Sequence, residues 1–118
     1  MTVTGAGARR KGSLWEREIV EYLRAHGFPY AERAYGAGRP DDRGDIDGVA
    51  GWVIEAKNQK TIELARWADE AKGEAENCQH PAYPAPPWAV IAKRRGRPVS
   101  DAYVVMSLEQ FARLMADD

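Results

Sequence analysis

The sequence predicts an α/β protein in which a small mixed β-sheet is flanked by helices. One observation is that apolar residues recur at helical spacing in three separate segments. A second is that short runs rich in β-branched and aromatic residues lie between those segments, bounded by glycine and proline. The predicted order is helix, strands, helix, strand, strand, helix, which is typical of a sheet covered by helices.

The three helices are predicted from their apolar stripes and their end signals. Ser13 is expected to begin the first helix, and Gly27 with Pro29 to end it. The second helix is expected over residues 62–78, and Ser107 is expected to cap a third. The stripes consist of Leu14, Trp15, Ile19, Val20, Tyr22 and Leu23 in the first helix, Leu64, Trp67, Ala68, Ala71, Ala75 and Cys78 in the second, and Leu108, Phe111, Leu114 and Met115 in the third.

The strands are predicted from apolar runs between turn-forming residues. Glycines and a proline make residues 36–44 a loop, and four prolines exclude regular structure from residues 80–87. Two strands joined across Ala50-Gly51 are expected to form a hairpin. The five expected strands cover residues 30–35, 45–49, 52–57, 88–93 and 102–106.

Length and composition indicate one small domain. The length of 118 residues predicts a single domain, over residues 13–118. The basic residues before it predict a flexible basic arm over residues 1–12. A single cysteine and the lack of a long apolar run favour a cytoplasmic protein without a membrane partner. The net charge of −1 argues mildly against nucleic acid, but basic residues cluster at 9–11 and 93–97, which argues mildly for it.

The residues that suggest chemistry lie in and before the strand over residues 52–57. Alternate side chains of a strand share a face, so Glu55 and Lys57 should point the same way. Asp45 and Asp47 share a face of the preceding strand, and a hairpin would bring carboxylates toward the lysine. Converging carboxylates repel unless a cation lies among them, and Mg²⁺ prefers such oxygen ligands. The alternative is an ordinary cross-strand ion pair.

Gly44-Asp45-Ile46 followed by Ile54-Glu55-Ala56-Lys57 resembles the signature of the PD-(D/E)XK nuclease superfamily, with Gly44 in place of the proline. Residues 11–20, which begin Lys-Gly and contain Glu16-Arg17, resemble the first helix of archaeal-type Holliday junction resolvases. Residues 33–38 resemble their loop but lack its serine, and residues 89–96 and 103–106 resemble small phage resolvases. The resemblance touches most of residues 11–115 and implies a restriction-endonuclease-like core.

This resemblance implies a metal-dependent endonuclease acting on branched DNA, with four-way junctions as the favoured substrate. Asp45 and Glu55 would hold Mg²⁺, with Mn²⁺ expected to substitute, and Lys57 would position or activate water; no small-molecule cofactor is expected. The resemblance favours Asp45 over Asp47. It also makes Glu16 a catalytic and metal residue, whereas Ser13-x-x-Glu16 alone reads as a capping box.

Two symmetric cuts in a junction would require a homodimer. A nicking or restriction-like nuclease and a non-catalytic DNA-binding module are the alternative functions. The expected DNA-binding residues are Arg9, Arg10, Lys11, Arg33, Lys60, Lys93, Arg94 and Arg95.

Overall fold

The computed structural model describes residues 5–34, 44–78, 82 and 84–116, and of residues 5–10 only the backbone. Its elements follow the predicted order. They are α1 (Gly5–Ala25), β1 (Glu32–Arg33), β2 (Ile46–Asp47), β3 (Val53–Lys57), α2 (Leu64–Asn77), β4 (Trp88–Ala92), the 3₁₀ turn η1 (Val99–Asp101), β5 (Tyr103–Val105) and α3 (Leu108–Ala116).

The five strands form one mixed sheet in the order β1-β2-β3-β4-β5. The first three strands pair antiparallel, β3 and β4 pair parallel, and β5 returns antiparallel to β4. The parallel pair requires a crossover, which α2 supplies. The predicted α/β class, with a mixed sheet flanked by helices, is therefore confirmed.

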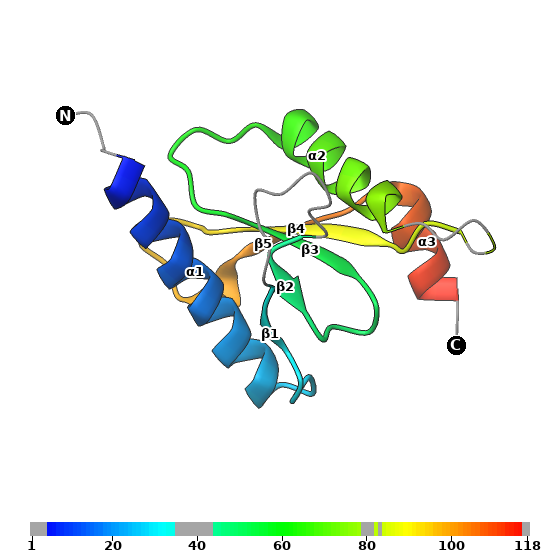
Figure 1. Cartoon of the computed structure of the whole chain (residues 1–118), viewed down its shortest axis with the longest axis horizontal. Helices are drawn as coiled ribbons and strands as arrows, with labels where there is room; N and C mark the ends of the chain where they lie inside the picture. The colour runs from blue at the N-terminus through cyan, green and yellow to red at the C-terminus, as the bar shows by residue number, and fades with distance from the viewer. Residues whose placement is uncertain (1–4, 35–43, 79–81, 83, 117–118) are drawn as a thin grey trace.

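Figure 1 shows α1 and α2 on opposite sides of the sheet. On the α1 side, Trp15 and Ile19 pack against Ile54. On the α2 side, Trp67 and Ala71 pack against Val53. The side chains of β3 thus alternate between two apolar layers, which fixes the face on which every residue of that strand lies.

The hairpin between β2 and β3 forms as predicted, with Ile46 opposite Ile54. Its turn is closed by a 2.9 Å hydrogen bond from the backbone N–H of Trp52 to the carbonyl of Val49. Ala50 and Gly51 both have positive φ, 51° and 78°, as a type I′ turn requires. This tight turn sets the register that places Asp45 beside β3.

The start of the first helix differs from the prediction. Helix α1 begins at Gly5, eight residues before Ser13, so residues 5–12 are not the flexible arm that the sequence suggested. Alanine, arginine and lysine are strong helix formers, and adding them to a helix already nucleated by its packed stripe costs little.

The last helix begins as predicted, because the Ser107 hydroxyl accepts the backbone N–H of Gln110 at 3.2 Å. The Gln110 side chain in turn accepts the N–H of Trp88 at 2.8 Å and donates to its carbonyl at 3.0 Å. Gln110 therefore satisfies the backbone of β4 where β5 does not reach, and it attaches α3 to the sheet. No helix in the described part of the chain is long and apolar enough to cross a lipid bilayer.

Candidate active site

Glu55 is the most unusual residue of β3, because it is a carboxylate in an apolar strand. Its neighbour Val53 on the same face belongs to the α2-side core. Glu55 is only 5% exposed, and its Oε1 has no hydrogen-bond partner among the described residues. A buried carboxylate oxygen without a partner is costly, so a cation or a hydrogen-bond donor is needed there.

Asp45 lies against β3 on both sides of Glu55. Its backbone N–H donates to the carbonyl of Ile54 at 2.8 Å, and its Oδ2 accepts the backbone N–H of Ala56 at 2.8 Å. The carboxylate of Asp45 therefore continues the sheet ladder where β2 diverges from β3. This arrangement brings Asp45 beside Glu55, as we expected from the predicted hairpin.

Gly44 permits this close approach of the two strands. It is buried with φ +104°, and a Cβ there would lie 3.0 Å from the carbonyl oxygen of Ile54. A side chain at this position would therefore push Asp45 away from β3. Gly44 thus has a structural role in this chain.

Lys57 ends β3 on the same face as Glu55, as strand alternation predicted. Its ammonium lies 2.7 Å from Oε2 of Glu70 on α2, and the Lys57 side chain is only 16% exposed. Sequence reasoning missed Glu70. A signal was present, because Glu70 is three residues after the buried Trp67 and so borders the face of α2 that packs on the sheet.

Glu16 approaches Asp45 from α1. Burial, and then the charge of Asp45, raise the pKa of Glu16 above its ordinary value of 4.5, while Arg33 partly offsets this rise. Arg33 Nε donates to Glu16 at 3.1 Å and its Nη2 donates to the Ser13 hydroxyl at 3.1 Å. Ser13 lies inside α1, so the capping-box interpretation of Glu16 is wrong.

The three carboxylates expected to hold metal do not form a closed cage. Within the described residues, no three acidic, histidine or cysteine side chains are grouped so as to hold a metal ion. Mg²⁺, however, usually takes only one or two protein carboxylates and completes its shell with water and substrate phosphate. Asp45 and Glu55, whose Oε1 has no hydrogen-bond partner in the described part of the chain, fit that smaller requirement.

Other predicted site residues lie outside this group or are engaged elsewhere. Asp47 is exposed and pairs in register with Glu32 of β1, whereas Asp45 contacts β3. Lys60 is exposed in the segment between β3 and α2. Arg33, expected to contact DNA, is held by Glu16 and Ser13. Most of the loop over residues 33–38 lies outside the described residues.

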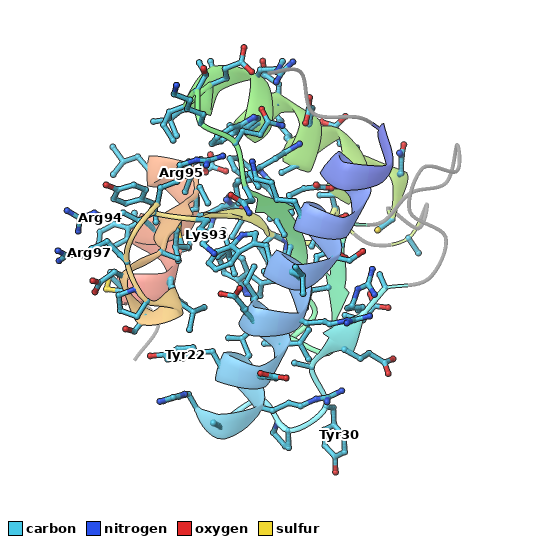
Figure 2. The ribbon with its side chains drawn as sticks, turned by 90° about the vertical axis from the view of Figure 1, so that its left-hand side faces the viewer. Tyr22, Tyr30, Lys93, Arg94, Arg95 and Arg97 are labelled. Atoms are coloured by element: carbon cyan, nitrogen blue, oxygen red, sulfur yellow. The ribbon has the colours of Figure 1, made fainter. Side chains whose placement is uncertain are left out.

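The predicted basic residues divide between α1 and the turn after β4. Arg9 and Arg10 lie in α1, but their side chains are outside the described part. Lys11 follows them and is half-buried. Figure 2 shows Lys93, Arg94 and Arg95 on the turn that faces α1. The first residue of this turn lies next to the last residue of β3, because the Lys93 N–H donates to the Lys57 carbonyl at 2.8 Å.

Comparisons with known proteins identify no relative of this chain: no protein-family model, no curated protein and no solved structure matches it.

Proposed function

We propose that this protein is a metal-dependent DNA endonuclease. The observation that carries the proposal is the buried carboxylate of Glu55, whose Oε1 has no hydrogen-bond partner among the described residues while Asp45 lies against the same stretch of strand. An ordinary ion-pair surface would not leave a carboxylate buried in this way. A cation bound at Glu55 would offset the free-energy cost of burying its carboxylate.

Each residue of the group has a role suited to phosphodiester hydrolysis. Asp45 and Glu55 would hold Mg²⁺, with Mn²⁺ able to replace it. When bound, the ion supplies Lewis-acid polarisation of the phosphodiester and lowers the pKa of a coordinated water. Lys57 follows Glu55 on the same face of β3, and its ammonium, paired with Glu70, would orient the attacking water or stabilise charge that develops on the phosphate.

The arrangement of the elements also supports a restriction-endonuclease-like core. The antiparallel β2–β3 hairpin carries Asp45, Glu55 and Lys57, and α2 then crosses over to the parallel strand β4. The preceding helix α1 brings Glu16 toward the same end of the hairpin. Such an arrangement places acidic and basic groups from three elements around one strand end.

Four-way junction DNA is the substrate that we propose, and a homodimer is the form that would cut it twice with two-fold symmetry. A chain of this size would double its DNA footprint by dimerising. Exposed apolar side chains on α3, such as Leu108 and Phe111 at 80% and 48% exposure, are compatible with association. Light scattering of the free protein and of its junction complex would measure the stoichiometry.

Two observations favour a second candidate, a non-catalytic DNA-binding module. Lys57 is already paired with Glu70, and the described residues contain no group of three metal ligands. In such a module Lys57 and Glu70 would form a structural ion pair and would have no catalytic role. Activity measurements with matched variants therefore have to decide between the two functions.

The test uses a synthetic four-way junction, a linear duplex and a flap substrate, each with Mg²⁺ or with EDTA. We expect Mg²⁺-dependent cleavage, favouring the junction, that Asp45→Asn and Lys57→Ala abolish while DNA binding persists. Asp47→Asn is the matched control, because it makes the same change at an exposed position two residues away. Undiminished cleavage by Lys57→Ala would refute the proposed mechanism, and junction binding without cleavage by the wild type would favour the non-catalytic module.

A further inference from the structure

The basic turn after β4 has two sides with different surroundings. Arg94 lies over the ring of Tyr103, 5.8 Å from its centroid, and Arg97 pairs with Asp101 at 3.0 Å. Figure 2 shows both arginines projecting away from α1, with Lys93 between the turn and that helix. The four cations of the turn therefore do not form one uniform patch.

Lys93 connects the turn to both α1 and the candidate active site. Its ammonium lies 5.3 Å from the ring centroid of Trp15 and 3.6 Å from a carboxylate oxygen of Glu18. Its backbone N–H donates to the carbonyl of Lys57 at 2.8 Å. The Lys93 side chain is therefore held against α1, while its backbone adjoins the strand end that carries Lys57.

Lys11 and Arg95 complete a cationic cluster with Lys93. Lys11 lies one helical turn before Trp15. Burial, followed by the charges of Arg95 and Lys93, lowers the pKa of Lys11 below 10.5. Among the described residues neither Lys11 nor Arg95 has an ion-pair partner, so Glu18 is the single carboxylate paired within a cluster of three cations.

The cations of such a cluster repel one another in the free protein, and a bound anion offsets this repulsion. The chain as a whole carries a net charge of −1, so this excess of positive charge is local. Lys93 contacts α1 through its side chain, and its backbone adjoins the strand end that carries Lys57. A ligand with several regularly spaced negative charges could contact the cluster and the candidate active site at once.

We propose that Lys11, Lys93 and Arg95 form a binding site for the backbone phosphates of duplex DNA, and that Arg94 and Arg97 of the same turn do not belong to it. The inference rests on the proposed nuclease function for its choice of ligand. In this arrangement the DNA strand would run from the end of β3 across Lys93 and along the first half of α1.

The experiment measures binding of a labelled 20-base-pair duplex and of a four-way junction in EDTA across a series of salt concentrations. Arg95→Gln is compared with Arg97→Gln, since both remove one charge from the same turn. Each phosphate contact contributes about 0.9 to the slope of log affinity against log salt. We expect Arg95→Gln, Lys93→Gln and Lys11→Gln each to lower the slope by about 1. Arg97→Gln should leave it unchanged, and Arg95→Lys should restore it.

Thermal melting of each variant separates lost contacts from lost folding, because only a folded variant can be interpreted. Equal slopes for Arg95→Gln and Arg97→Gln would overturn the inference, since charge alone would then explain binding. Tighter binding of a single-stranded RNA of the same length would overturn the assignment to duplex DNA. Retained slope differences without any Mg²⁺-dependent cleavage would refute the proposed nuclease function and leave the phosphate site standing.

Discussion

The ammonium of Lys57 lies 2.7 Å from Oε2 of Glu70, so the lysine of the candidate active site is held by the helix that covers its strand. Lys57 is mostly buried, whereas Glu70 is 41% exposed and also lies 3.8 Å from Arg66. A lysine side chain has many rotamers, and the ion pair selects among them. Glu70 thus acts on Lys57 from outside the strand hairpin.

Glu70→Gln is expected to lower the turnover of the DNA substrate roughly tenfold or more, because a reacting group displaced by about 1 Å can lose two orders of magnitude in rate. DNA affinity should stay unchanged, since Glu70 bears no positive charge that could contact phosphate. Glu70→Asp, which keeps the charge, should recover part of the loss. Single-turnover kinetics and equilibrium binding of the junction measure the two quantities.

The matched control is Asp69→Asn, one residue earlier on α2 and also exposed. It removes the same charge from the same helix without touching Lys57. A drop in turnover as large as that of Glu70→Gln would show that the charge of α2 matters and the ion pair does not.

The sequence predicted those features of the site that depend on local periodicity. Alternation along β3 placed Glu55 and Lys57 on one face, and the Ala50-Gly51 turn predicted the hairpin that brings Asp45 near them. The contacts of Glu70 and Arg33 could not be predicted in this way, because they join residues 13 or more positions apart through the packing of helices on the sheet. The early start of α1 could not be predicted either, because it depends on propagation of the helix backward from its packed stripe.

Mg²⁺ should stabilise the folded protein against heat, because an ion held by Asp45 and Glu55 binds the native state better than the unfolded chain. The gain is about 2.7 kcal/mol when the free ion is at 100 times its dissociation constant. Glu55→Gln should abolish this gain. In EDTA the same variant should melt at a higher temperature than the wild type, since it removes a buried charge whose Oε1 has no partner among the described residues.

Differential scanning calorimetry with and without Mg²⁺ measures both effects. Asp47→Asn serves as the control that should respond to Mg²⁺ as the wild type does. The metal assignment fails if Mg²⁺ raises the melting temperature of Glu55→Gln as much as that of the wild type.

Glu16 should make stability depend on pH in the metal-free protein. Its pKa is raised above 4.5 by burial and by Asp45, so the folded state binds this proton more tightly than the unfolded chain. The stability that Glu16 contributes is therefore fully present below pH 4.5 and is lost as the pH rises through the raised pKa. Between pH 4.5 and 7, the free energy of unfolding of Glu16→Gln should rise relative to that of the wild type.

Urea denaturation in EDTA at several pH values measures this difference. Asp45→Asn should reduce the pH dependence, because it removes one of the two causes of the raised pKa. A difference between wild type and Glu16→Gln that stays constant over the whole range would contradict the placement of Glu16 next to Asp45.

Gly48 should be the glycine of the hairpin that tolerates substitution least, because it combines a positive φ with a close backbone contact. Its φ is +83°, and a Cβ would lie 2.1 Å from the carbonyl oxygen of Tyr30. Gly48→Ala should therefore destabilise the protein by about 2 kcal/mol or more, since the left-handed conformation alone costs roughly 1–2 kcal/mol. Gly73→Ala is the matched control: it lies inside α2 with no atom within 4 Å of the added Cβ, and it should stabilise by about 1 kcal/mol. Chemical denaturation gives both values.

Because Gly48 follows β2, its substitution should also reduce cleavage by loosening the hairpin that places Asp45 beside Glu55. A Gly48→Ala variant as stable as the wild type would contradict the packing of this hairpin on the segment before β1.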